Sequence, residues 1–211
     1  MLSVDENGLT VSAPWRSSER RIVGVIRDAE AWVLKKLDVW STFPSRNQSW
    51  IQGDKVRYLG RDLSLHLTTD SVVTLASLLD GDRLQISLAD PAHKDSVKAA
   101  VVKWYRRHAQ ANFSGRIGEL APRLDLPAPR LFLSNARTRW GSCNAKREVR
   151  LNWRLIQAAQ PTIDYVVVHE LAHLIEMNHS RRFWKLVASV CPHYREACAE
   201  LNRMGLYYMD I

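Results

Sequence analysis

Residues 161–179 read PTIDYVVVHELAHLIEMNH, and this stretch decides the fold. It contains the pattern His-Glu-x-x-His from His169 to His173, followed by His179. In a helix, residues four apart lie on one face, about 6 Å apart along the axis, so the two imidazoles can bind one cation. Glu170 then lies beside that cation and can take a proton from an attacking water. The stretch therefore predicts a helix that carries a hydrolytic metal site.

A third metal ligand is needed, because a catalytic zinc has three protein ligands and one open position. His179 can supply it only if the helix ends after Glu176, since a continuous helix would point His179 away. Asn178 favours the left-handed turn that ends helices, and Ser180 can cap a second helix that stops at Cys191-Pro192. The sequence leaves three alternative ligands open, namely Glu176, Glu196 and Glu200. A further alternative is that the histidines are structural and only form hydrogen bonds in a core.

The ligand set predicts zinc as the cofactor, with one ion per chain. Zinc lowers the pKa of a coordinated water to about 7, and an adjacent carboxylate serves first as base and then as acid. Hydrolysis of a carbonyl or a phosphoryl centre follows from this chemistry.

The composition is that of an ordinary globular protein. The chain has 211 residues, of which 46% are hydrophobic and 25% charged, which excludes disorder, collagen-like repeats and coiled coil as its main character. Its cysteines are Cys143, Cys191 and Cys198, with no CxxC pair, so neither a disulfide framework nor a four-thiolate zinc site is expected. The N-terminus lacks a secretion signal, and apolar runs long enough to span a membrane are absent. We expect a cytoplasmic protein.

The positive charge is concentrated in one part of the chain. Residues 1–90 hold 11 Lys and Arg against 12 Asp and Glu, whereas residues 91–211 hold 19 against 10. A basic field of this kind attracts polyanions, so nucleotides or nucleic acids are candidate partners.

Hydrophobic periodicity divides the chain at about residue 90. Residues 1–90 predict a helix over 17–37 and then antiparallel strands between 50 and 88, with a tight hairpin at Asp80-Gly81. Asp90-Pro91 predicts the start of a long basic helix in which His108 is structural or exposed. Strands are expected at 130–134 and 148–153. The predicted domains are thus 1–90, an N-terminal α+β region, and 91–211, the metal-binding catalytic domain.

Several segments resemble the YgjP-like metal-dependent hydrolases, a zincin group related to the SprT-like and WLM metallopeptidases. The resemblance covers about residues 130–201 and implies that His169, His173 and His179 are the metal ligands and Glu170 the catalytic base. Such chains usually begin with an additional basic strand, and only eight residues precede Leu9 here, so we expect the N-terminal sheet to be short of a strand. The segments that carry the resemblance are Arg139-Trp140-Gly141-Ser142-Cys143, Leu151–Ile156, Ile163–Leu174, and Asn178-His179-Ser180 with Phe183-Trp184.

The spacing HExxHxxExxH also matches the metzincin peptidases, except that Glu176 stands where they have glycine. Membership of the metzincins is therefore not supported.

Other residues near the predicted site have less certain roles. Arg139 can stabilise an oxyanion or a phosphate, whereas Trp140 and Cys143 fit packing positions better. The strand 149–153 is a candidate sheet edge for an extended peptide. Four residues are possible donors to a developing oxyanion: His193, Tyr194, Tyr207 and Tyr208.

Together, these features predict an α+β protein with a zincin-like metallopeptidase domain, preceded by a small N-terminal region of helix and antiparallel strands. The expected activity is zinc-dependent hydrolysis of a peptide or protein substrate. One alternative is hydrolysis of a nucleotide phosphoanhydride, as in a pyrophosphatase. Another is a basic module associated with nucleic acid, in which the metal site is secondary.

Overall fold

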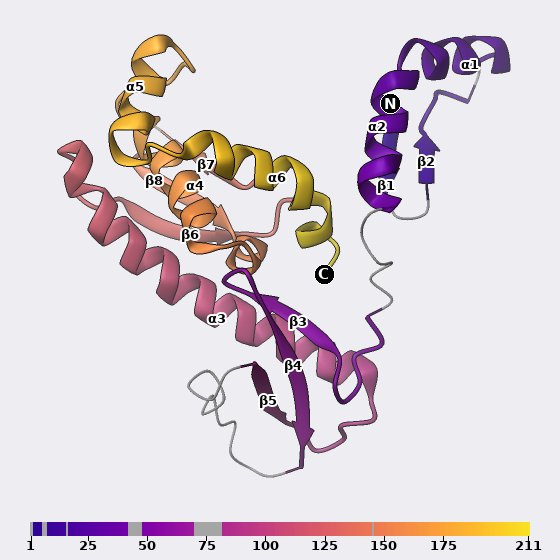
Figure 1. Cartoon of the computed structure of the whole chain (residues 1–211), viewed down its shortest axis with the longest axis horizontal. Coiled ribbons are helices and arrows are strands. Elements are labelled where there is room, and N and C mark those ends of the chain that lie inside the picture. The colour runs from indigo at the N-terminus through magenta and orange to yellow at the C-terminus, as the bar shows by residue number, and fades with distance from the viewer. Residues whose placement is uncertain (1, 6–7, 16, 42–47, 70–81, 145) are drawn as a thin grey trace. The chain divides into compact units, whose positions relative to one another are not determined.

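Figure 1 shows the computed structural model, which describes residues 2–5, 8–15, 17–41, 48–69, 82–144 and 146–211. The chain forms two compact units, one of residues 1–47 and the other of residues 48–209 with Ile211. The chain contains both helices and small sheets, so the predicted α+β class is confirmed. The described residues include no helix that is both long and apolar enough to cross a membrane.

The first unit contains a hairpin and two helices. Strands β1 (Leu2–Asp5) and β2 (Gly8–Val11) pair antiparallel, so a strand does precede the segment that begins at Leu9. The helix expected over 17–37 is two helices, α1 (Glu19–Asp28) and α2 (Glu30–Ser41). The break lies at Ala29, whose ψ of 6° departs from helical geometry.

The second unit begins with the sheet β3-β4-β5, formed by β3 (Lys55–Tyr58), β4 (Arg61–Thr68) and β5 (Arg83–Ser87). Strands β3 and β4 are antiparallel, but β5 runs parallel to β4, which corrects the expectation of antiparallel strands throughout. Alternation of apolar residues predicts a strand and the face it buries, but it is the same for either direction of pairing. The hairpin predicted at Asp80-Gly81 lies outside the described residues.

The long basic helix is α3 (Lys94–Leu120). Its cap is His93, whose Nδ1 accepts the Ser96 N–H at 3.2 Å, and Asp90-Pro91 instead forms a turn just before it, in which Asp90 accepts the Ala92 N–H. One stripe of the helix is buried, as the sequence predicts. It consists of Val97, Val101, Trp104, Tyr105, Ala109, Phe113, Ile117 and Leu120.

A second sheet, of order β6-β8-β7, contacts helix α4 (Gln160–Ala172). Its strands are β6 (Arg130–Ser134), β7 (Gly141–Cys143) and β8 (Glu148–Asn152). Strand β8 is parallel to β6 and antiparallel to β7, so it is the central strand. The prediction that residues 149–153 form a sheet edge is therefore wrong, because β6 and β7 occupy both sides of β8 and no free backbone edge is left for a peptide.

Three helices complete the unit: α4 (Gln160–Ala172), α5 (Arg181–Val190) and α6 (Tyr194–Met209). Helix α4 is apolar on most of its surface and packs against α3, α5 and α6 (Figure 1). The Arg116 guanidinium of α3 joins it through two hydrogen bonds to Asp164, at 2.6 and 2.8 Å. Such bidentate pairs fix orientation as well as adding stability.

The first sheet belongs to the same compact unit as helices α4, α5 and α6. The backbone N–H groups of Leu59 and Gly60 donate to Ile156 and Gln157 of the 3-10 helix η3 (Trp153–Gln157), at 2.9 and 3.1 Å. The Tyr105 hydroxyl donates to the Arg57 carbonyl at 2.7 Å. The compact unit thus begins at Gln48, whereas the sequence placed the domain boundary after residue 90. A change of hydrophobic period marks a change of element, and only these long-range contacts show which elements share a core.

Replacing Phe113 by alanine tests where the core lies. Phe113 is 0% exposed on α3, so we expect Phe113→Ala to lower the free energy of unfolding by about 3–5 kcal/mol, measured by urea denaturation. The matched control is Phe132→Ala on β6. Because Phe132 is 38% exposed, this substitution should lower the free energy of unfolding by less than about 1 kcal/mol. Equal costs for the two variants would contradict this assignment of the core.

Candidate metal centre

The three predicted histidines converge on one point. His169 lies on α4, His173 is the residue that caps it, and His179 lies in the loop before α5. The Nε2 atom of His169 is 3.2 Å from that of His173 and 3.1 Å from that of His179. Nitrogens that share a tetrahedral zinc at 2.0–2.1 Å are about 3.3 Å apart. The spacing therefore fits one metal ion held by three imidazoles.

Hydrogen bonds at the far side of the rings favour the same role. The Nδ1 of His173 is 3.2 Å from the Glu176 carbonyl oxygen, which can only accept, so Nδ1 carries the proton and Nε2 keeps its lone pair. The Nδ1 of His169 lies 3.5 Å from the Tyr165 hydroxyl. The first contact leaves the Nε2 lone pair of His173 free to face the common centre, and the second helps to orient the ring of His169.

The chain turns before His179 and Ser180 caps the next helix, as predicted, but the helix ends before Glu176 and not after it. Helix α4 ends at Ala172, and the N–H groups of Leu174 and Ile175 close tighter turns onto Leu171 and Ala172, both at 3.0 Å. Ser180 then caps α5 by accepting the Phe183 N–H. Asn178 is not among the described residues with positive φ, so its left-handed conformation was wrongly predicted. The tightened last turn reverses the chain instead.

Two histidines of the cluster, His169 and His173, are kept neutral by their surroundings. Burial, and then the neighbouring His173 and His179, lower the pKa of His169 to about 4. Burial and His179 also lower the pKa of His173, against the opposing effect of the hydrogen bond that His173 donates to the Glu176 carbonyl. Because metal ligation requires the neutral imidazole, the cluster is ready to bind a cation at neutral pH.

Glu170 is buried beside this cluster, with 5% of its surface exposed. Burial raises the pKa of its carboxyl to about 7, and the charge of Arg139 opposes that rise. A carboxylate with a pKa near the working pH can both accept and return a proton. Its environment therefore suits general base catalysis.

Gly141 in β7 allows the strand to lie directly against Glu170. A Cβ at this position would be 2.5 Å from Glu170 Oε1 and 2.6 Å from its Cγ. Only glycine fits there without displacing the carboxylate. Gly141 was not among the residues of this segment that the sequence pointed to, which were Arg139, Trp140 and Cys143, although glycine inside a strand signals close backbone approach.

Asn152 holds the segment that leads into β7, and it too was missed. It is 0% exposed, and its side-chain amide donates to the carbonyls of Ala136 at 2.6 Å and Arg139 at 3.3 Å. Its backbone N–H donates to the Trp140 carbonyl at 2.8 Å. Asn152 therefore fixes the backbone that carries Arg139 and Gly141.

Aromatic rings surround the histidines on the α5 side. The Phe183 ring lies 4.5 Å from that of His173 and 4.9 Å from that of His169. Trp184 stacks on His179 at 5.8 Å and on Tyr194 at 5.2 Å. These rings exclude water from one side of the centre, which strengthens electrostatic interactions within it.

The candidate oxyanion donors are placed differently from one another. Tyr194 belongs to the aromatic group at the centre, whereas the Tyr208 hydroxyl donates to Glu200 at 2.8 Å. His193 is exposed and lies 3.3 Å from Glu196. Tyr207 has a ring contact with Tyr208. Of the four, Tyr194 is the one that the ring contacts connect to the histidines.

The alternative carboxylate ligands do not join the cluster. Within the described part of the chain, the group able to hold a metal consists of His169, His173 and His179, with ligand atoms within 4.8 Å of one another. Glu200 instead accepts hydrogen bonds from Thr162 and Tyr208.

Burial and the charge of Glu170 raise the pKa of Cys143, which keeps this residue a protonated thiol.

Comparison with known proteins gives three findings. A family model described as YgjP-like, metallopeptidase domain, matches residues 1–204. The UTP pyrophosphatase of Escherichia coli (strain K12) is 36% identical over 66 residues, which are 31% of this chain and 40% of that protein, so the chain matches less than half of this relative. The solved metallopeptidase zymogen of Pyrococcus abyssi abylysin has 19% sequence identity and a TM-score of 0.41, covering 44% of this chain and 95% of that chain.

Removing one histidine tests the metal centre. We expect the wild-type chain to hold about one zinc and His173→Ala to hold almost none, because two ligands bind far more weakly than three. Elemental analysis of protein purified without added metal measures this. The control is His66→Ala, because His66 lies on β4 and contacts Gln52 instead. Zinc retained in His173→Ala would exclude the proposed ligand set.

Proposed function

Because the chain belongs to the YgjP-like family of metallopeptidase domains, we propose that it is a zinc-dependent hydrolase. Its ligands are His169, His173 and His179, and Glu170 is its general base. The observation that carries this proposal is the convergence of the three Nε2 atoms beside one buried carboxylate. When bound, zinc would polarise the scissile group and increase the acidity of the attacking water.

Glu170 performs the proton transfers in this proposal. Its carboxylate accepts a proton from the attacking water and then gives it to the leaving group, a sequence that a pKa near 7 allows. Gly141 leaves room for the carboxylate, and Asn152 fixes the segment that precedes Gly141. Tyr194 and Arg139 are the candidates to stabilise charge on the substrate oxygen.

A peptide or protein is the first candidate substrate. Strand β7 is an outer strand of its sheet, and Gly141 places it against Glu170. An extended peptide that paired with this strand would lie beside the base through backbone hydrogen bonds alone. The description of the family as a metallopeptidase domain supports the same substrate class.

A nucleoside triphosphate is the second candidate, because a relative is named for pyrophosphatase activity. Arg139, whose charge acts on Glu170, is exposed and could neutralise a phosphate. Binding to nucleic acid is supported only by the basic charge of residues 91–211.

We place the enzyme in the cytoplasm because all three cysteines are free thiols.

Two assays separate the substrate classes. The zinc-loaded protein is incubated with a labelled unfolded protein and, separately, with a panel of nucleoside triphosphates scored for pyrophosphate release. We expect cleavage of the unfolded protein if the peptide proposal holds, whereas pyrophosphate release alone would replace it with the nucleotide proposal. No turnover in either assay by a chain that holds zinc would contradict both.

Glu170→Gln tests the base in whichever assay is positive. The amide cannot accept a proton, so we expect turnover to fall by about 100- to 10,000-fold while zinc content is unchanged. Glu119→Gln is the control, because Glu119 is on the exposed face of α3 and pairs with Arg116. Normal turnover by Glu170→Gln would remove Glu170 from its role.

Gly141→Ala tests the close approach of β7 to the base. The added methyl would displace the Glu170 carboxylate, and a shift of about 1 Å in a catalytic group can cost about 100-fold in rate. We expect that loss of turnover with normal zinc content. Gly118→Ala on α3 should keep full turnover, because a Cβ there meets nothing within 4 Å. Equal turnover in the two variants would contradict the positioning role.

A further inference from the structure

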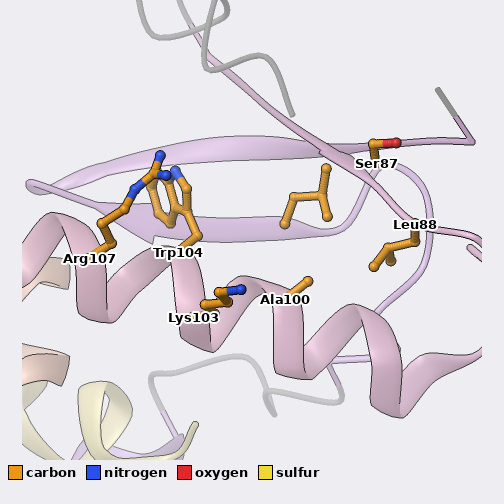
Figure 2. A pocket seen from close by; sticks show the side chains of 7 residues that line it. Ser87, Leu88, Ala100, Lys103, Trp104 and Arg107 are labelled. Atoms are coloured by element: carbon orange, nitrogen blue, oxygen red, sulfur yellow. The ribbon is translucent and has the colours of Figure 1, made fainter. Parts of the chain in front are cut away.

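A cavity of about 310 Å³ lies between β5 and α3, formed by residues other than those of the metal centre. A volume of this order is at the lower end of the range for small-molecule sites. Figure 2 shows Trp104 and Arg107 rising from α3 on the same side, with Ser87 and Leu88 across from the helix. The lining consists of Ile86, Ser87, Leu88, Ala100, Lys103, Trp104 and Arg107.

The indole of Trp104 presents a donor that has no acceptor. The residue is 5% exposed, and among the described residues its Nε1 is one of the buried atoms without a hydrogen-bond partner. Its ring contacts those of Tyr58, at 4.9 Å, and His108, at 4.5 Å, so the indole cannot easily turn to find one. The Nε1 atom itself has almost no accessible surface, so the Trp104 ring adds to the apolar wall of the cavity and does not donate to a ligand inside it.

The charges at the cavity favour a negative acceptor. Lys103 and Arg107 are both exposed residues of its lining, and none of the described lining residues is acidic. The remaining wall is mostly apolar, from Ile86, Leu88 and Ala100.

We propose that this cavity binds a small organic anion. Its carboxylate or phosphate accepts hydrogen bonds from the Arg107 guanidinium, and Lys103 adds charge. Its apolar body lies against Ile86, Leu88 and Ala100. Charge-assisted hydrogen bonds of this kind are stronger than neutral ones, and the apolar wall adds the free energy of burial. The proposal does not depend on the hydrolytic function.

Calorimetric titration of the full chain tests the proposal with four probes. These are 2-naphthoate and 2-naphthyl phosphate, which share an apolar body and differ in the anion, 2-naphthalenemethanol, which has no charge, and inorganic phosphate, which has no body. We expect one or both naphthyl anions to bind at one site, and the tighter of the two identifies the anion. The neutral alcohol and inorganic phosphate should bind at least about tenfold more weakly, since the alcohol lacks the negative charge and phosphate lacks the apolar body.

Variants locate the binding. Arg107→Gln should weaken binding of the naphthyl anion at least about tenfold. Arg106→Gln should leave the affinity unchanged, because Arg106 is the neighbouring residue on α3 and does not line the cavity. Ala100→Leu fills the cavity without changing charge and should abolish binding. Thermal melting of each variant confirms that it is folded.

Three results would overturn the proposal. The first is no binding of either naphthyl anion, which would leave water as the occupant of the cavity. The second is equal binding of the neutral alcohol. The third is an equal loss of affinity in Arg106→Gln and Arg107→Gln, as expected for nonspecific attraction to a basic surface.

Discussion

The burial of α4 is the constraint on which the metal centre depends. This helix is covered by α3, α5 and α6, and β7 approaches it at Gly141, so most of its side chains are out of water. Burial keeps the imidazoles of His169 and His173 neutral and raises the pKa of Glu170. The same packing therefore sets the protonation states that metal binding and proton transfer require.

Two features complete the centre around α4. The tight turn after Ala172 brings His179 back to the other imidazoles, and the Ser180 cap begins α5, which supplies Phe183 and Trp184. On the other side, Asn152 holds the strand segment that contains Gly141. The proposed ligand from a loop and the proposed base from a helix are thus fixed by elements that are themselves packed against α4. This rigidity matters because a metal site tolerates little error in ligand position.

Most elements of the fold were predictable, because most of them have a local signal. The apolar stripe of α3, the strands 130–134 and 148–152, and the cap at Ser180 all follow from periodicity or capping chemistry. The mistakes concern pairing between distant segments. Strand β8 is central because β7, only three residues long and without a periodic signal, pairs with it. Strand β5 is parallel to β4, and the alternation of apolar residues does not reveal the direction in which two strands pair.

The sequence by itself determined the chemistry at the centre, because the spacing of His169, Glu170 and His173 on a helix fixes their common face. It also determined that the chain must turn before His179. Only the tertiary structure decided that His179, and neither Glu196 nor Glu200, completes the cluster, because that choice depends on contacts between segments. The need for glycine at position 141, the role of Asn152 and the unpaired indole of Trp104 are likewise decided by neighbours far away in the chain.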